Sequence, residues 1–212
     1  MVLSTPVNSP WDESAAWEAC RSLIAELKVS PANRASWQCR AAQRLSAHGL
    51  ADQAKSWLDD VVKTLRPLVE ANPKDPDLLL QYGLALSEQG IHDDAVAALQ
   101  RLVELDGRDP NSHWNLAKVY RKAGRNEEAA ASLETLLKTQ PHNIAAWVTL
   151  GRLQRLLGKL EESQKSLKTA LQLAPTDPYA KSALQETEEA LRSASKQEQP
   201  PAEAKTPTTT SS

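Results

Sequence analysis

The feature that most constrains the fold of this 212-residue chain is a set of residue types that recur every 34 residues. Three glycines, Gly90, Gly124 and Gly158, are separated by this interval. A second phase of the same interval holds Asp75, Asp109, Asn143 and Asp177, and a third holds Pro73, Gly107, Pro141 and Pro175. Several residue classes in one period indicate an array in which a single supersecondary unit is repeated.

Each phase has a mechanical meaning. Asp and Asn accept hydrogen bonds from the free backbone amides at a helix start, and a following proline suits the first helical position. The glycines, about fourteen residues later, are typical of helix ends that need a left-handed backbone. Acidic pairs such as Asp93 and Asp94 then indicate the start of a second helix, because negative side chains are stabilising at the positive end of the helix dipole. The sequence therefore predicts three consecutive helix-turn-helix units.

The apolar positions of these units resemble those of the tetratricopeptide repeat (TPR) family. In the first unit, the family's first-helix residues correspond to Leu79, Tyr82, Gly83 and Leu86, and its second-helix residues to Ala95, Leu99 and Leu102. Two departures are His113 and Gln154, which stand where the family usually has Trp and Tyr. The small residues expected where the two helices of a unit cross closely are Gly83, Ala95, Ala117, Ala129, Gly151 and Ser163.

The resemblance implies an all-α fold, a right-handed α-α superhelical solenoid of TPR hairpins closed by a capping helix. The TPR units are expected at 76–109, 110–143 and 144–177, and the capping helix at 178–196. A solenoid needs such a polar end because its last repeat would otherwise expose an apolar face. The remaining expectations are a flexible segment at 1–9, helices over 10–75 with a divergent TPR-like hairpin at 31–75, and a disordered tail at 197–212.

Composition excludes several classes of protein. The 25 Lys and Arg residues nearly balance 27 Asp and Glu, which argues against bulk attraction to nucleic acid or anionic membranes. Two cysteines, Cys20 and Cys39, are too few for a disulfide-rich scaffold or a four-cysteine zinc site. No apolar run approaches the roughly 20 residues of a membrane span, and no secretory signal is visible, so we expect a cytoplasmic protein.

The sequence gives little support for catalysis. Its histidines, His48, His92, His113 and His142, show no metal-binding spacing, and the glycines are explained by turns and close helix crossings. No phosphate-binding loop or nucleophile motif is present. We therefore predict no enzyme activity, no catalytic or metal-binding residues and no cofactor.

The resemblance instead implies partner binding, because the first helices of TPR hairpins line a concave groove that holds a segment of another protein. We expect the family's groove positions to be occupied by Leu80, Gln81, Leu84, Asn111, Trp114, Asn115, Lys118, Arg121, Lys122, Val148, Thr149, Arg152 and Arg155. Five of these are cations, and no acid shares the groove positions of the second and third repeats. The predicted partner is an acidic or amphipathic protein segment, since arginine suits carboxylate recognition.

A carboxylate clamp for chaperone C-termini is not predicted. The family's clamp positions hold Leu80, Leu84, Asn115, Ala145 and Thr149, and shifting back one repeat gives Cys39, Gln43, Gln81, Asn111 and Asn115. Neither register supplies the clamp's cations.

Three alternatives stay open. The groove cations could be an ordinary solvated helix face. Trp114 among cations could stack on single-stranded RNA, although the pI of 6.1 and a single groove aromatic fall short of the usual basic stripe. The chain could also assemble with itself through the N-terminal tryptophans, Trp11, Trp17, Trp37 and Trp57, which could equally form core.

Overall fold

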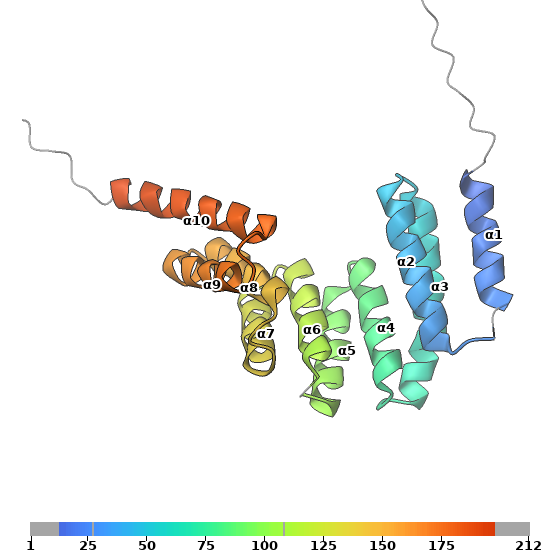
Figure 1. The fold of residues 1–212 in the computed structure, drawn as a ribbon. Helices are drawn as coiled ribbons and strands as arrows, with labels where there is room; N and C mark the ends of the chain where they lie inside the picture. The colour runs from blue at the N-terminus through green and yellow to red at the C-terminus, as the bar shows by residue number, and fades with distance from the viewer. Residues whose placement is uncertain (1–12, 27, 108, 198–212) are drawn as a thin grey trace, which may run out of the picture. The chain divides into compact units, whose positions relative to one another are not determined.

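The computed structural model describes residues 13–26, 28–107 and 109–197, and every regular element in these ranges is an α-helix (Figure 1). The all-α prediction is confirmed. The chain divides into two compact units, Met1–Ala129 and Ala130–Ser212, whose boundary falls inside α7 (Asn126–Thr139).

Unit 1 is a stack of helical hairpins. Its helices are α1 (Glu13–Glu26), α2 (Pro31–Ala47), α3 (Ala51–Ala71), α4 (Pro76–Glu88), α5 (His92–Leu105), α6 (Pro110–Lys122) and the first residues of α7. The α2–α3 and α4–α5 pairs pack as hairpins, and each hairpin packs on the element that follows it. The first helices of successive hairpins also touch, α2 with α4 and α4 with α6. This stacking is the solenoid arrangement that the repeat requires.

Unit 2 contains the rest of α7, α8 (Ile144–Leu156), α9 (Leu160–Leu173) and α10 (Pro178–Gln197). The α8–α9 pair forms a hairpin, and α10 lies along α9 and also contacts α8 (Figure 1). A buried cluster of Val148, Leu167, Ala170, Ala180 and Ala183 joins these three helices. α10 therefore covers the apolar face of the last hairpin.

The helix ends follow the capping residues expected from the sequence. Asp75 and Asn143 each accept a hydrogen bond of 3.0 Å from the backbone amide three residues later, and Asp177 accepts one of 2.7 Å. Asp109 accepts from the amide of Asn111 at 3.0 Å. The turn glycines Gly90, Gly124 and Gly158 have φ angles of 81°, 74° and 76°, which side-chain-bearing residues rarely adopt. The predicted caps and turns are confirmed.

The close crossing within a hairpin is confirmed at two glycines. A Cβ placed on Gly83 would lie 2.9 Å from Cγ of Leu99. One placed on Gly151 would lie 2.6 Å from Cγ of Leu167. Both distances are shorter than van der Waals contact, so a side chain at either glycine would displace the leucine that packs against it.

Before the regular repeats, α2 and α3 form a longer hairpin. α3 has 21 residues against 14 in α5, so it extends about two helical turns further. α1 is tied to this hairpin by Arg21, which forms an ion pair with Asp60 and lies 5.9 Å over the ring of Trp57. The expected flexible segment at 1–9 lies outside the described residues, as does the expected disordered tail after Gln197.

Candidate partner-binding surface

The first helices of the unit 1 hairpins share one face, and Glu88 marks it. Its carboxylate accepts a hydrogen bond of 2.9 Å from Nε2 of Gln43 on α2. It also forms an ion pair with Nζ of Lys122 on α6. Because Glu88 lies at the end of α4, these contacts join α2, α4 and α6 side by side along the surface where we expect the groove.

Most predicted contact residues of unit 1 are accessible from this face. On α4, Leu80, Gln81 and Leu84 are half-buried. On α6, Trp114, Lys118 and Lys122 follow at intervals of four residues, so they form one row along the helix. Trp114 is half-buried, whereas Lys118, Arg121 and Lys122 are exposed. Apolar surface and cations thus adjoin on α6.

The two predicted asparagines of α6 are used within their own helix. Nδ2 of Asn115 donates to the backbone oxygen of Asn111 at 2.9 Å. The amide Nδ2 of Asn111 donates to Oδ1 of Asp109 at 3.1 Å, beside the cap. Each side-chain NH2 has two N–H groups, and one of them is engaged in these contacts.

In unit 2 the predicted residues separate by burial. Val148, expected as an apolar contact, is 8% exposed and packs in the core cluster beneath α10. Thr149 is half-buried, and its hydroxyl donates to the backbone oxygen of Ala145 at 2.7 Å. Arg152 is exposed, and Leu156 at the end of the helix is 64% exposed. Val148 is therefore part of the core, whereas Leu156 of the same helix is accessible to a partner.

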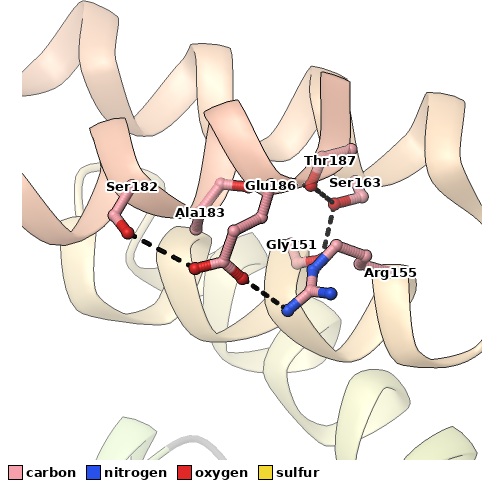
Figure 2. Close-up of polar contacts among 7 residues, drawn as sticks. All are labelled: Gly151, Arg155, Ser163, Ser182, Ala183, Glu186 and Thr187. Carbon is pink, nitrogen blue, oxygen red and sulfur yellow. Dashed lines mark hydrogen bonds and ion pairs between the residues drawn. The ribbon is translucent and has the colours of Figure 1, made fainter. Parts of the chain in front are cut away.

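Arg155 forms an ion pair with Glu186. Its Nη2 lies 2.7 Å from Oε2 of Glu186 on α10, and Oε1 of the same carboxylate accepts from Ser182 at 3.3 Å (Figure 2). Glu186 thus lies between Arg155 and Ser182. The guanidinium and the carboxylate are both partly exposed.

A buried polar network fixes α10 next to this ion pair. The hydroxyl of Ser163 on α9 donates to the backbone oxygen of Gly151 at 2.7 Å and lies 3.0 Å from Oγ1 of Thr187 (Figure 2). Thr187 has one hydroxyl proton, which it can donate to the backbone oxygen of Ala183 at 2.8 Å or to the Ser163 oxygen. Ser163 and Thr187 have no exposed surface, so every hydroxyl must be satisfied inside the protein.

These pairs change the predicted charge of the surface. Of the five cations, Lys122 is paired with Glu88 and Arg155 with Glu186. Within its own unit, and among the residues that the structure describes, each of Lys118, Arg121 and Arg152 forms no ion pair. The two acids, Glu88 on α4 and Glu186 on α10, lie outside the second and third repeats, whose predicted groove positions contain no acid. Lys118 and Arg121 belong to unit 1 and Arg152 belongs to unit 2. A single groove that runs across all three repeats therefore stays a prediction.

Sequence reasoning missed a cleft of about 370 Å³ in unit 2. Its lining residues come from α7, α8 and α9, and they are Glu134, Leu137, Lys138, Trp147, Leu150, Gln154, Glu162, Lys165, Ser166 and Thr169. Nε1 of Trp147 donates to the backbone oxygen of Pro141 at 2.8 Å, which fixes the indole at the edge of this cleft. Since two of its helices are second helices of hairpins, the cleft is separate from the predicted groove positions.

The tryptophans considered for self-association differ in exposure. Trp57 is 1% exposed and belongs to the core of unit 1, which is the core alternative that the sequence left open for it. Trp37 is 38% exposed. Trp11 and the side chain of Trp17 lie outside the described part of the chain.

The cysteines are a buried and an exposed free thiol. Burial, together with the nearby Glu88 carboxylate, raises the pKa of the Cys39 thiol from its ordinary 9.0 to about 12. Cys20 is exposed. In the described ranges, no group of three or more His, Cys, Asp or Glu side chains is arranged to hold a metal ion. The same ranges contain no helix with the length and apolarity needed to cross a membrane.

Comparison with known families agrees with the repeat. A family model described as "Tetratricopeptide repeat" matches residues 120–187, and one described as "TPR repeat" matches residues 83–124. None of the curated proteins compared with the chain matches it by sequence.

Solved structures with similar folds are TPR proteins. A crystal structure of MamA has a TM-score of 0.58 at 16% identity, over 77% of this chain and 86% of that one. The Sgt2 TPR domain from Aspergillus fumigatus has a TM-score of 0.54 at 19% identity, over 63% and 90%. The first TPR of Spaghetti (RPAP3), bound to the HSP90 peptide SRMEEVD, has a TM-score of 0.51 at 23% identity, over 55% and 93%. These similarities show the fold.

Proposed function

Since this chain is a TPR-repeat protein, we propose that it is a non-enzymatic adaptor whose groove binds an acidic or amphipathic segment of a partner protein. The observation that carries the proposal is a set of three cations, Lys118, Arg121 and Arg152, that have no acidic partner within their own units in the described chain. In unit 1, Lys118 lies one turn after half-buried Trp114 on α6, and half-buried Leu84 lies on the neighbouring helix α4.

The chemistry of this surface favours a segment with carboxylates and apolar anchors. Arginine can donate two parallel hydrogen bonds to one carboxylate. Aromatic and aliphatic side chains supply the area that gives an interface most of its affinity. An isolated segment loses conformational freedom on binding, so a dissociation constant near micromolar, about −8 kcal/mol, is expected for a single site.

The partner differs from the chaperone peptide of the Spaghetti complex. At the family's clamp positions the chain has Leu80 and Leu84 in α4 and Ala145 in α8, which cannot pair with a terminal carboxylate. In the alternative register, one N–H of the Gln43 amide is bonded to Glu88 and Cys39 is buried, and neither residue carries a positive charge. The unpaired cations instead lie further along α6 and α8, so we propose recognition of internal acidic residues.

The test measures the binding of two fluorescein-labelled synthetic peptides by fluorescence anisotropy. In one, leucines alternate with short runs of glutamate, and in the other every glutamate is replaced by glutamine. We expect the full chain to bind the glutamate peptide more tightly, with an affinity that falls as salt rises. Charge reversal of the groove (Lys118→Glu with Arg121→Glu, and separately Arg152→Glu) should remove this preference.

The matched control is Lys168→Glu, an exposed lysine on α9, which makes the same charge change away from the groove positions. It should leave the preference between the peptides intact. Equal affinity of the wild type for both peptides, at all salt concentrations, would refute the basic groove as the binding surface.

A further inference from the structure

We infer that Glu186 is a resident carboxylate in the anion site of Arg155, and that an acidic partner gains access to Arg155 by displacing it. The inference deepens the proposed function and rests on it. It assigns to α10 a role beyond capping the last hairpin, because one of its side chains sets the selectivity of the groove.

The geometry of the pair shows an occupied but incomplete anion site. Glu186 contacts the guanidinium through Oε2 and Nη2 at 2.7 Å, while its other oxygen is turned toward Ser182 (Figure 2). Nε of Arg155 is buried and has no hydrogen-bond partner among the described residues. A guanidinium presents donors on a planar fork that fits two carboxylate oxygens. A partner's carboxylate that accepted two parallel hydrogen bonds along one edge of the guanidinium would therefore satisfy Arg155 better than the single contact to Glu186 does.

The pair is exposed enough to exchange. The side chains of Arg155 and Glu186 are 30% and 42% exposed, so water and salt screen their attraction. Ion pairs at this level of exposure change an equilibrium by about two- to fivefold. A resident carboxylate of this strength weakens a competing carboxylate without excluding it.

Displacement does not require α10 to move. Thr187, the next residue, is fully buried, and its hydroxyl lies 3.0 Å from that of Ser163 and 2.8 Å from the backbone oxygen of Ala183. Rotation of the Glu186 side chain releases Arg155 while this network keeps the helix in place. The exchange is thus a side-chain event inside a fixed groove.

Neighbouring residues indicate the kind of segment that fits. Leu156 follows Arg155 and is 64% exposed, and Arg152 lies on the previous turn with no acid paired to it in the described part of unit 2. A segment with two acidic residues near one large apolar residue would reach both arginines and Leu156. A neutral segment with the same apolar residue has no reason to displace Glu186.

The experiment compares Glu186→Gln with Glu188→Gln in the full chain, with the same glutamate and glutamine peptides as probes. Both variants remove one negative charge from α10, but Glu188 faces Gln164 of α9, at 3.4 Å. We expect Glu186→Gln to bind the glutamate peptide about two- to fivefold more tightly than the wild type, with the glutamine peptide unchanged. Glu188→Gln should match the wild type.

A second variant guards against misfolding. Ser182 is exposed, so Ser182→Ala keeps the fold while removing one contact that holds Glu186. It should tighten binding of the glutamate peptide in the same direction and by less. If Arg152→Glu weakens binding but Glu186→Gln and Ser182→Ala both match the wild type, the inference is wrong and the proposed function stands. If the wild type and all the variants bind the glutamate and glutamine peptides with equal affinity, the inference and the proposed function are both wrong.

Discussion

The close helix crossing at Gly151 makes a quantitative prediction for Gly151→Ala. The added Cβ would meet Leu167 at 2.6 Å from Cγ and 2.9 Å from Cδ2, about 1 Å inside normal contact. Leu167 is fully buried within the cluster of α8, α9 and α10, so it has little room to turn away. Overpacking of this kind costs about 1–3 kcal/mol.

The helix itself opposes this cost, because alanine stabilises a helix interior by about 1 kcal/mol relative to glycine. The expected net destabilisation is about 0–2 kcal/mol, near the upper end at so short a distance. Gly83→Ala is the matched comparison. Its Cβ would lie 2.9 Å from Cγ of Leu99, so we expect a smaller loss of stability there.

The assay is native-state hydrogen exchange of the α8 and α9 amides, since hairpins of a repeat array open separately. A second background isolates the clash. With Leu167→Ala, which removes the obstructing side chain, Gly151→Ala should stabilise the α8 and α9 amides by about 1 kcal/mol. The reasoning is refuted if Gly151→Ala stabilises the hairpin equally in both backgrounds, because the added methyl group would then have free space.

Three further predictions concern the thiol, the buried hydroxyls and a helix cap. The raised pKa of Cys39 means that the folded protein keeps a proton which the unfolded chain loses above pH 9, so the free energy of unfolding should fall as pH rises from about 9 toward 12. Urea unfolding at several pH values should show this slope in the wild type and a weaker one in Cys39→Ala. Ser163→Ala removes the buried hydrogen bond to the backbone oxygen of Gly151 and should lower the free energy of unfolding by about 1 kcal/mol, measured by hydrogen exchange of the α9 and α10 amides. Ser193→Ala, which removes an exposed hydroxyl, should be near neutral. Asp109→Ala removes the cap of α6 and should lower unit 1 stability by about 1 kcal/mol, measured by α6 amide exchange, whereas Asp109→Asn should retain most of it.

The sequence predicts the hairpins well because their ends depend on local chemistry. A capping Asp or a glycine at positive φ acts within one turn of the chain, so its residue type and its phase in the period are sufficient. His113, which departs from the family pattern, still makes the contact expected at its position in the repeat. His113 lies 3.1 Å from the backbone oxygen of Gly107, and Trp147 bonds to Pro141 in the same phase. The imidazole therefore makes the contact that the indole makes one repeat later.

The surface charge is harder to predict because it depends on side chains from adjacent helices. The partners of Lys122 and Arg155 lie 34 and 31 residues away, and whether they meet is decided by helix register and rotamer. Comparing groove positions within the second and third repeats cannot reveal a carboxylate contributed by α4 or α10. The cleft beside Trp147 is missed for the same reason, since its lining comes from three helices.

Ser163 connects the repeat pattern to the candidate site. Its phase holds alanine in the two preceding repeats, Ala95 and Ala129, where a second helix crosses a first. A hydroxyl at a fully buried crossing is unfavourable unless it is bonded, and an unsatisfied group costs about 1–3 kcal/mol. The Ser163 proton is donated to Gly151, and the Ser163 oxygen can accept from Thr187 of α10 at 3.0 Å, so this contact favours the register of α10 that brings the two hydroxyls together. That register places Glu186, one residue earlier, beside Arg155. The serine that distinguishes the third repeat therefore favours the position of α10 in which Glu186 pairs with Arg155.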